Sequence, residues 1–380
     1  MNRDVDEGLA RRLAAPFVGG SPLRADEIGD GNLNVVHRVT GAGGSVIVKH
    51  APPYLRVVGD TWPLSQDRIR IEAEALTLYE EMAPGRGPRL CAVDLAHAAI
   101  VLEDLADHEV WRTSLVKGRH VEGVAEQLGR CCARMLLGTS DLVMNPARRK
   151  TLAMQFVNPQ LCSITEELVF RAPYVDSPSN RYDEAAAELA ASLRTDLPMR
   201  RSAARLLLEF RSRREALVHG DLHTGSVMVA DGDARVIDPE FAFFGPMAYD
   251  TGNVMANLAF AAIRHQEMGE SRFADTVTGY ARQFWQSLTE EVRVVWPATQ
   301  PWDPIFVAEL LADTGRYAAT ELVRRIVGLA HVADIDTLDG PSRLRAQRRA
   351  VAGARSIALG PAVRTLDDLW NRMTTKEPAS

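Results

Sequence analysis

Two short stretches of the chain carry carboxylates at a spacing that suits phosphoryl transfer. Asp221 lies in HGDLHTGS, residues 219–226, and Ser226 follows it five residues later. Asp238 and Glu240 lie two residues apart, across a proline. The first aspartate can accept the proton of an attacking hydroxyl, and the second pair can hold the Mg²⁺ that offsets the charge of a transferring phosphoryl group. Together the two stretches predict ATP-dependent phosphotransfer with Asp238 and Glu240 as metal ligands.

The residues around these carboxylates predict a strand, a turn and a hairpin. Residues 216–218 form a short apolar run, and residues 226–230 have β character. Asp231-Gly232 supplies a turn, after which residues 235–237 return as a strand. The two carboxylate clusters therefore fall at opposite ends of a hairpin, as in protein kinases, where a polar residue five positions after the catalytic aspartate helps to hold a metal.

A glycine-containing loop precedes a second predicted hairpin, residues 27–50, which ends in Lys49. Backbone amides of such a loop can approach a triphosphate, and a lysine in this place contacts phosphates and pairs with a glutamate of the following helix. Helical periodicity predicts that helix over residues 68–82, with Glu72 preferred over Glu74 as the partner. The nucleotide-binding candidates of this region are Gly29, Asp30, Gly31, Asn32, Asn34, Lys49 and Glu72.

Two further segments are expected to lie near the nucleotide. Residues 51–67 are too rich in proline for a helix or a central strand, and Trp62 within them is expected to fold over core or ligand. Residues 98–108 pass from an apolar strand into an acidic loop, which we interpret as the hinge between two lobes. The backbone of Glu103 and Leu105 is the candidate contact for adenine.

The rest of the chain is mostly helical in pattern. Residues 319–335 are apolar on nearly every side and are expected to form a buried helix, yet Arg324 and Arg325 lie in its middle. Buried guanidinium groups need anions, and here these are either structural carboxylates or a transferring phosphoryl group. Further helices are expected at residues 250–265, 271–296, 304–332, 342–358 and 362–374.

Length and composition bound the class of protein. The 380 residues are 46% hydrophobic and 25% charged, with a net charge of −6, which is typical of a globular protein that binds neither nucleic acid nor an anionic membrane. The 4 cysteines show no metal-binding spacing, and no apolar segment is long enough to span a bilayer, so a cytoplasmic location is expected. The predicted fold class is α+β with two lobes, a small β-rich lobe at residues 1–105 and a larger helical lobe at residues 106–380.

At this point the motifs resemble one family closely. GDGNLN, the segment VKHAPPYLRVVGDTWPLSQDRIRIEAEAL, VHGDLHTGSVMV, VIDPEFAFFGPMAYDTG and LVRRIVGLAHVADI are similar to the methylthioribose kinase family, within the aminoglycoside phosphotransferase and choline kinase branch of the protein-kinase-like fold. The similarity covers most of residues 27–336. The chain departs from the family pattern at His50, Pro52, Ala248 and Tyr249, which leaves the preferred 5-substituent of the ribose open.

The resemblance implies roles for the candidate residues. Asp221 would orient or deprotonate the C1 hydroxyl of 5-methylthioribose, and Arg324 and Arg325 would bind the sugar and stabilise transition-state charge. Asn32 and Trp62 would contribute to substrate binding. ATP and Mg²⁺ would be the cofactors, methylthioribose 1-phosphate of methionine salvage the product, and a homodimer the assembly.

Two alternatives remain. The first is a related kinase acting on 5-deoxyribose, an aminoglycoside, choline or homoserine, although paired arginines near the cleft disfavour a cationic substrate. The second is a catalytically silent nucleotide-binding module. Such a module typically loses the lysine, the catalytic aspartate or the metal-binding acid, whereas this chain keeps all of them.

Overall fold

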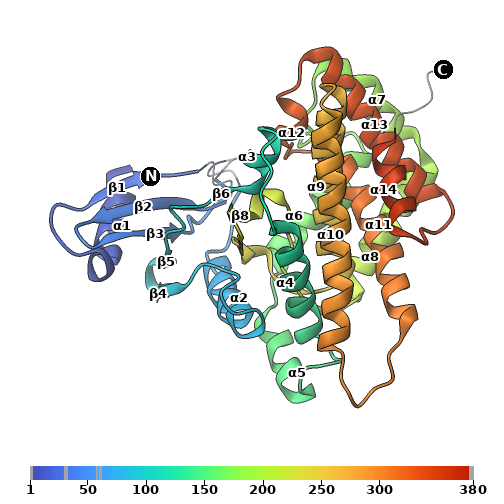
Figure 1. Cartoon of the computed structure of the whole chain (residues 1–380). Helices are drawn as coiled ribbons and strands as arrows, with labels where there is room; N and C mark the ends of the chain where they lie inside the picture. Colours follow the sequence, from blue (N-terminus) through green and yellow to red (C-terminus); the bar gives the residue numbers. More distant parts are fainter. Residues whose placement is uncertain (1–2, 30–32, 57–58, 60–61, 376–380) are drawn as a thin grey trace. The chain divides into compact units, whose positions relative to one another are not determined.

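The computed structural model describes residues 3–29, 33–56, 59 and 62–375 (Figure 1). The chain divides into two compact units. The first, which we call the sheet unit, comprises Met1–His108 together with Arg235–Ala242. The second, the helical unit, comprises Glu109–Ala234 and Phe243–Ser380. The predicted α+β class is confirmed, because the first unit is built on a five-stranded sheet and the second is mostly helical.

The sheet unit is built on one antiparallel sheet with the strand order β1-β2-β3-β5-β4. The predicted hairpin is present, with its turn between Gly41 and Gly44. The helix predicted over residues 68–82 forms over those residues. The elements are α1 (Arg3–Val18), β1 (Arg24–Glu27), β2 (Val35–Gly41), β3 (Gly44–His50), α2 (Arg68–Met82), β4 (Leu90–Asp94) and β5 (Ala99–Glu103).

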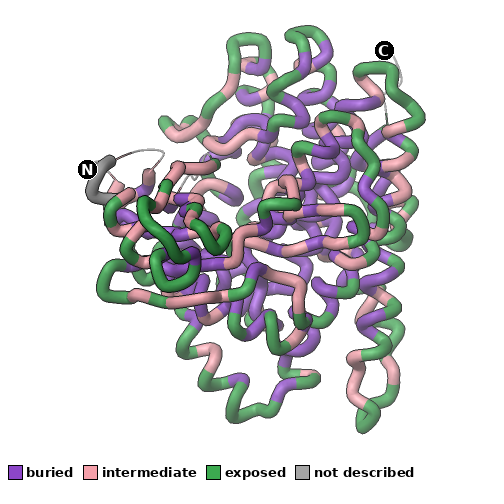
Figure 2. The backbone as a smooth tube through the Cα atoms, turned by 60° about the vertical axis from the view of Figure 1, so that its left-hand side comes forward, coloured by how far each residue is buried: buried purple, intermediate pink, exposed green. Residues whose placement is uncertain are grey.

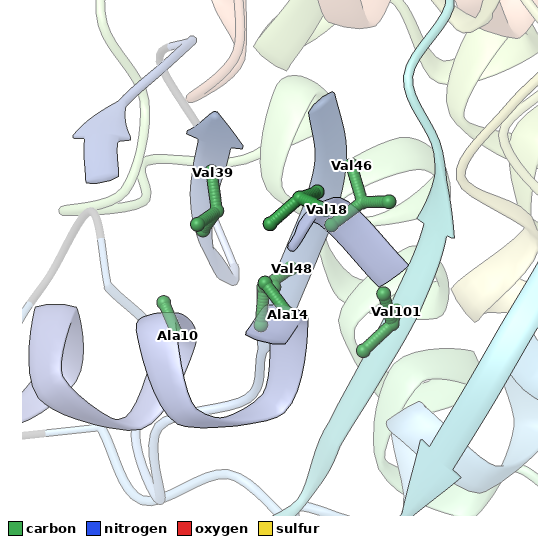
Figure 3. Packing of buried hydrophobic residues seen from close by; sticks show 7 residues of the cluster. All are labelled: Ala10, Ala14, Val18, Val39, Val46, Val48 and Val101. Atoms are coloured by element: carbon green, nitrogen blue, oxygen red, sulfur yellow. The ribbon is translucent and has the colours of Figure 1, made fainter. Parts of the chain in front are cut away.

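Alternation along the strands gives the sheet two buried faces. Val46 and Val48 of β3 contribute to one cluster, which Ala10 and Ala14 of α1 cover (Figure 3). On the opposite face of the sheet, Ile100 and Leu102 of β5 pack with Ile69, Ala73 and Leu76 of α2. The sheet therefore lies between α1 and α2. Lys49, near the end of β3, is buried within this packing.

The turn Asp238-Pro239-Glu240 belongs to the sheet unit, whereas the predicted boundaries place it in the helical lobe. The amide of Val236 donates to the carbonyl of Arg86, 2.7 Å away. The short helix η5 (Pro239–Phe241) packs against α2. These contacts bring the metal-binding candidates beside the lysine that the early part of the chain supplies.

The helical unit begins with β6. Between two of its short strands, β7 and β8, lie residues 219–226, which we call the catalytic turn because they contain Asp221. β7 pairs with β10, and β6 pairs with β8, both antiparallel. The helices are α3 (Trp111–Val116), α4 (Val124–Gly138), α5 (Pro146–Gln155), α6 (Pro159–Phe170), α7 (Ala187–Thr195), α8 (Leu197–Ser212), α9 (Met247–Glu267), α10 (Ser271–Val295), α11 (Pro304–Val327), α12 (Ala333–Asp336), α13 (Gly340–Leu359) and α14 (Leu366–Thr374). The strands are β6 (Glu109–Val110), β7 (Ala216–Val218), β8 (Val227–Ala230), β9 (Asp233–Val236), which runs on into the sheet unit, and β10 (Phe243–Gly245).

Helix α9 forms the core of the helical unit. It is buried on all sides from Met247 to His265 and packs against α10, α11, α13 and α14. Buried segments accordingly run through the interior of this unit, with exposed segments in the outer loops (Figure 2). Tyr249, one of the departures from the family pattern, lies in an aromatic cluster with Phe170, Phe210 and Tyr317.

The expected continuous helix over residues 319–335 is wrong. Helix α11 ends at Val327, and the chain resumes helical structure only at Ala333. Gly328 marks the break, because its extended backbone (ψ −169°) would bring a Cβ within 2.4 Å of the carbonyl oxygen of Arg324. The apolar pattern continues past the glycine because Val332 of the loop and Ile335 of α12 are buried as well.

Helices in the described part of the chain are all too short or too polar to cross a lipid bilayer.

Candidate active site

A carboxylate of helix α9 binds the backbone of the catalytic turn in the helical unit. Asp250 is fully buried, and its carboxylate accepts hydrogen bonds from the amides of His219 (2.6 Å) and Gly220 (3.0 Å). These donors belong to the residues that directly precede Asp221. The core helix thereby fixes the backbone from which the candidate base projects.

Side chains within the turn close it on itself. Nδ1 of His223 accepts from the amide of Gly225 at 3.0 Å, so the ring proton lies on Nε2, which is 3.4 Å from Oδ2 of Asp221. Burial lowers the pKa of His223 to about 4, against the opposing influence of Asp221, so the imidazole is neutral near pH 7. The hydroxyl of Ser226 donates to the carbonyl of Asp221 at 2.9 Å. Ser226 therefore shapes the turn, and its part in metal binding stays a prediction.

Both predicted arginines reach the candidate base. NH2 of Arg324 donates to Oδ1 of Asp221 at 3.0 Å, and NH2 of Arg325 lies 3.5 Å from the same oxygen. Burial favours the protonated form of Asp221, but contacts with His223 and with the two guanidinium groups outweigh it and hold the pKa of Asp221 well below its usual range. Asp221 is thus ionised, and it keeps 30% of its side-chain surface exposed, as a group that receives a substrate must.

Glu321, one turn earlier on α11, binds both arginines. It is fully buried, and its two carboxylate oxygens each accept from the Nε of one guanidinium, Oε2 from Arg324 and Oε1 from Arg325 at 2.7 Å. Burial alone would raise the pKa of Glu321, but the two arginines lower it to about 2. The anions that the buried arginines require are therefore Glu321 and Asp221.

The sheet unit places Lys49 among three carboxylates. Its Nζ donates to Oε1 of Glu72 at 2.8 Å and to Oδ1 of Asp238 at 2.9 Å, and Oε2 of Glu240 lies 3.9 Å away. Glu74 pairs with Arg70 instead. Burial lowers the pKa of Lys49, but the three carboxylates outweigh it and raise the pKa, so the ammonium stays charged.

The carboxylates around Lys49 carry an excess of negative charge. Burial raises the pKa of Glu72 to about 8, and repulsion from Glu240 and Asp238 adds to the effect of burial against the attraction of Lys49. The pKa of Glu240 is raised as well, chiefly by burial. Beside one ammonium, the three carboxyl groups either carry net negative charge or keep a proton on one of them, and a bound divalent cation would favour their ionised form.

The donor set suits Mg²⁺. Asp238 adopts a left-handed backbone conformation (φ 62°), which is strained for a residue other than glycine and is a recurrent feature of functional sites. No cage of three acidic, histidine or cysteine side chains occurs among the residues that the structure describes. Mg²⁺ is typically bound by one or two carboxylates with phosphate oxygens and water, so Asp238 and Glu240 would be sufficient.

Asn34 connects Glu240 to the end of the glycine loop. Its side chain is buried, donates from Nδ2 to Glu240 and accepts from Nε of Arg68 at 2.8 Å. Gly29 has a φ of +75°, as a tight loop requires. Asp30, Gly31 and Asn32 lie outside the described residues. In this structure Asn34 orients a metal-binding candidate, and its contact with nucleotide remains a prediction.

The remaining candidates of the sheet unit lie in its loops. Trp62 is half-buried, and its carbonyl accepts from the amide of Leu55 at 2.8 Å. The amide of Glu103 donates to the carbonyl of Arg89 at 2.9 Å, so it is engaged within the protein, and the carbonyl of Leu105 accepts from His108. The proposed contacts of these residues with substrate or adenine stay predictions.

Comparison with known proteins agrees with this geometry. The model of the phosphotransferase enzyme family matches residues 24–285, more than half of the chain. A methylthioribose kinase of Yersinia enterocolitica is 39% identical over 367 residues, which are 92% of each chain. A methylthioribose kinase of Pectobacterium carotovorum is 38% identical over 371 residues, again 92% of each chain. The chain belongs to the methylthioribose kinase family.

Solved structures are more distant from this methylthioribose kinase family member. The ethanolamine kinase of Plasmodium vivax gives a TM-score of 0.49 at 12% identity and covers 93% of this chain and 89% of its own. A spectinomycin phosphotransferase gives a TM-score of 0.49 at 11% identity and covers 95% of this chain and 98% of its own.

Sequence reasoning did not identify three residues of the clusters around Asp221 and Lys49. These residues are Asp250, Glu321 and Arg68. Each of them either contacts partners that are distant in the sequence or resembles an ordinary polar residue of a helix. A signal was present for Glu321, because a glutamate three and four residues before a buried arginine pair lies on the same helical face. Arg68 and Asp250 offered no comparable local signal.

Proposed function

We propose that this protein is an ATP-dependent kinase that transfers a phosphoryl group to the C1 hydroxyl of 5-methylthioribose. The product is methylthioribose 1-phosphate, an intermediate of methionine salvage. Membership in the methylthioribose kinase family supports the proposal. The observation that carries it is the pair of arginines on Asp221, with terminal nitrogens 3.0 and 3.5 Å from the same carboxylate oxygen.

The helical unit supplies the acceptor chemistry. Asp221 orients the C1 hydroxyl and accepts its proton as the new oxygen–phosphorus bond forms and the bond to the ADP leaving group breaks. A carboxylate of low pKa is a weak base, but in a loose phosphoryl-transfer transition state the hydroxyl keeps its proton until late. Arg324 and Arg325 bind the sugar and neutralise charge on the transferring group.

The sheet unit supplies the nucleotide and metal chemistry. Lys49, positioned by Glu72, binds the ATP phosphates together with the loop from Gly29 to Asn34. Asp238 and Glu240 hold the metal, for which we propose Mg²⁺, and Ser226 of the helical unit supports it. When bound, Mg²⁺ offsets the charge of the phosphates. Glu103 and Leu105 contact adenine, and Asn32 and Trp62 contact the sugar.

The charge of the arginine pair also indicates which class of acceptor the site favours. Two fixed positive charges beside Asp221 disfavour cationic acceptors such as choline or an aminoglycoside. A neutral sugar has hydroxyls that both a carboxylate and guanidinium groups can bind. A 5-modified ribose is therefore the class of substrate that the charges favour.

The test is a coupled assay of ADP release with Mg·ATP and five acceptors: 5-methylthioribose, 5-deoxyribose, ribose, choline and kanamycin. We expect methylthioribose to give a kcat/KM of at least about 10⁴ M⁻¹s⁻¹ and the highest value of the panel. A preference for 5-deoxyribose would keep the reaction and change the substrate. No ADP release with any acceptor would contradict the proposed function and favour a silent nucleotide-binding module.

For assembly and location we propose a cytoplasmic homodimer, on the basis of the family resemblance. Light scattering coupled to size-exclusion chromatography measures the mass directly. A mass of one chain, 41.8 kDa, across the concentrations used in the assay would contradict the dimer.

A further inference from the structure

A closed ring of buried polar contacts surrounds the catalytic turn. It starts at Asp221, which Arg324 contacts, and passes to Glu321 on α11. From Oε1 of Glu321 it continues to Nδ2 of Asn257 on α9, 3.0 Å away. Arg112 of α3 completes it, because NH2 donates to Oδ1 of Asn257 at 2.6 Å and Nε donates to the hydroxyl of Thr224 at 3.2 Å. Thr224 returns the ring to the turn that carries Asp221.

Glu321 is the member of this ring that binds both arginines through their Nε atoms. It accepts from the Nε of both Arg324 and Arg325 and from Asn257. Its exposed fraction is 0%, so water does not compete for either oxygen. A buried carboxylate in this position is tolerated because its charge is met by two guanidinium groups and its lone pairs by three donors.

Glu321 binds each guanidinium group through its Nε atom, and this determines the direction of the two terminal nitrogens. Because Glu321 takes the Nε of both groups, the terminal nitrogens are left to face Asp221. NH2 of Arg324 uses this freedom to donate to Oδ1 of Asp221 at 3.0 Å. NH2 of Arg325 is buried and makes no hydrogen bond within the described part of the chain. It lies 3.5 Å from Oδ1 of Asp221, so it is a donor directed at the carboxylate that NH2 of Arg324 also binds.

The helices that carry the ring are held at close distance. Gly252 of α9 faces α11, where a Cβ would come within 2.8 Å of the amide nitrogen of Ala318. This approach brings Asn257, further along α9, within hydrogen-bonding distance of Glu321. The packing of the core helices thus fixes the position of the carboxylate on which the arginines depend.

We propose that Glu321 is a positioning residue for phosphoryl transfer, which presents the terminal nitrogens of Arg324 and Arg325 to the acceptor and the transferring group. The proposal rests on the roles of the arginines in the proposed function. Glu321 does not touch the reacting atoms. It acts through the arginines, and Asn257 with Arg112 ties it to the catalytic turn.

Glu321→Gln is the informative variant. An amide has one oxygen and one NH₂ group, so it accepts from one guanidinium and presents donors to the other. One arginine then loses its anchor and its orientation. We expect kcat to fall about 10²-fold, the size of effect seen when one transition-state donor is lost, with the KM for ATP unchanged. Glu309→Gln, on an exposed position of the same helix, is the matched control and should leave both constants unchanged.

A double-mutant cycle separates positioning from general damage. If Glu321 acts through the arginines, Glu321→Gln should reduce kcat much less in an Arg324→Ala or Arg325→Ala background than in the wild type. Effects that multiply in both backgrounds would overturn the proposal, as would an unchanged kcat. Glu321→Asp keeps the charge but is too short to reach both groups, so it provides the same cycle if the glutamine variant does not fold.

A spectroscopic arm does not depend on turnover. In the wild type the Nε–H groups of Arg324 and Arg325 are buried hydrogen-bond donors, so their ¹⁵N-edited NMR signals should be resolved and protected from exchange with water. Arg324→Lys and Arg325→Lys assign them. In Glu321→Gln at least one of the two signals should lose its protection, and retention of both would contradict the anchoring. If the wild type phosphorylates no sugar, the proposed function fails while this measurement still decides the anchoring.

Discussion

In the proposed mechanism, Asp221 has to remain ionised and yet accept a proton. Contacts with His223, Arg324 and Arg325 keep its pKa well below the usual range, which makes it a weak base. Phosphoryl transfer tolerates a weak base, because most of the catalysis comes from positioning and charge stabilisation. The same arginines that weaken the base can stabilise the transferring group, so a single arrangement serves both needs.

Replacing Asp221 by asparagine should therefore stop turnover without preventing nucleotide binding. The amide keeps the size of the side chain but cannot take up the proton. We expect kcat to fall at least about 10²-fold, while the ATP affinity measured by calorimetry stays within about twofold. Asp231→Asn, on an exposed turn of the same hairpin, is the control. Turnover near the wild-type rate would remove Asp221 from the mechanism.

His331, in the loop between α11 and α12, contacts two polar groups outside this loop. Nε2 of His331 lies 2.6 Å from the carbonyl of Arg181, and Nδ1 lies 3.2 Å from Oδ1 of Asp336. Only the protonated ring donates in both directions. The hydrogen bond with Asp336 raises the pKa of His331 above its ordinary value, against the effect of burial.

This contact predicts a pH dependence of stability. Because the folded-state pKa of His331 is raised, its contribution is fully present below the unfolded value of 6.5 and is lost as the pH rises through the folded value. The free energy of unfolding should therefore decrease between about pH 6 and pH 8 by more in the wild type than in His331→Gln, which does not titrate. Urea unfolding at both pH values measures it. Equal slopes in the two proteins would mean that His331 does not contribute.

Arg68, the first residue of α2, forms hydrogen bonds with three other segments of the chain. It is almost fully buried and donates to Asn34 Oδ1 and to the carbonyls of Leu33, Pro52 and Ser65. The carbonyls of Pro52 and Ser65 lie at the two ends of the segment that contains Trp62. One side chain thereby joins the glycine loop, the ends of that segment and, through Asn34, the candidate metal ligand Glu240.

Arg68→Met should be among the most destabilising substitutions in the sheet unit. It fills similar volume but removes the donor to buried Asn34 and to the carbonyl of buried Pro52, and each such loss costs about 1–3 kcal/mol. We expect a loss of at least about 3 kcal/mol in the free energy of unfolding, measured with urea. Arg89→Met, an exposed arginine of the same unit, is the control. A loss below about 1 kcal/mol would show that water replaces the arginine.

Local pattern was sufficient for some features and insufficient for others. The hairpin ending in Lys49 and the helix over residues 68–82 follow from periodicity and turn residues, and both are confirmed. The pairing of Asn34 with Glu240 joins residues 206 positions apart, and nothing in either segment specifies the other. The break at Gly328 was missed because burial continues beyond it, so hydrophobicity alone did not mark the end of the helix.

At the scale of the whole molecule, the chemistry is divided between two units. The sheet unit holds Lys49, Glu72, Asp238 and Glu240, although the last two follow the catalytic turn in the sequence. The helical unit holds Asp221 with both arginines. The chain passes between the units within the hairpin, and this explains why the order of the motifs in the sequence does not give their grouping in space.

This division predicts that nucleotide binding and turnover can be lost separately. Mg·ADP at about 100 times its Kd should stabilise the wild type by about 2.7 kcal/mol and raise the Tm by a few degrees. Lys49→Met removes the ammonium that we propose binds the phosphates, so both the Tm shift and kcat should be lost. Asp221→Asn lies in the other unit and should keep the full shift without turnover. The wild type with Mg²⁺ alone is the reference for each variant. If Asp221→Asn abolished the shift as completely as Lys49→Met, nucleotide binding would depend on the catalytic turn, and the assignment of binding to the sheet unit would be wrong.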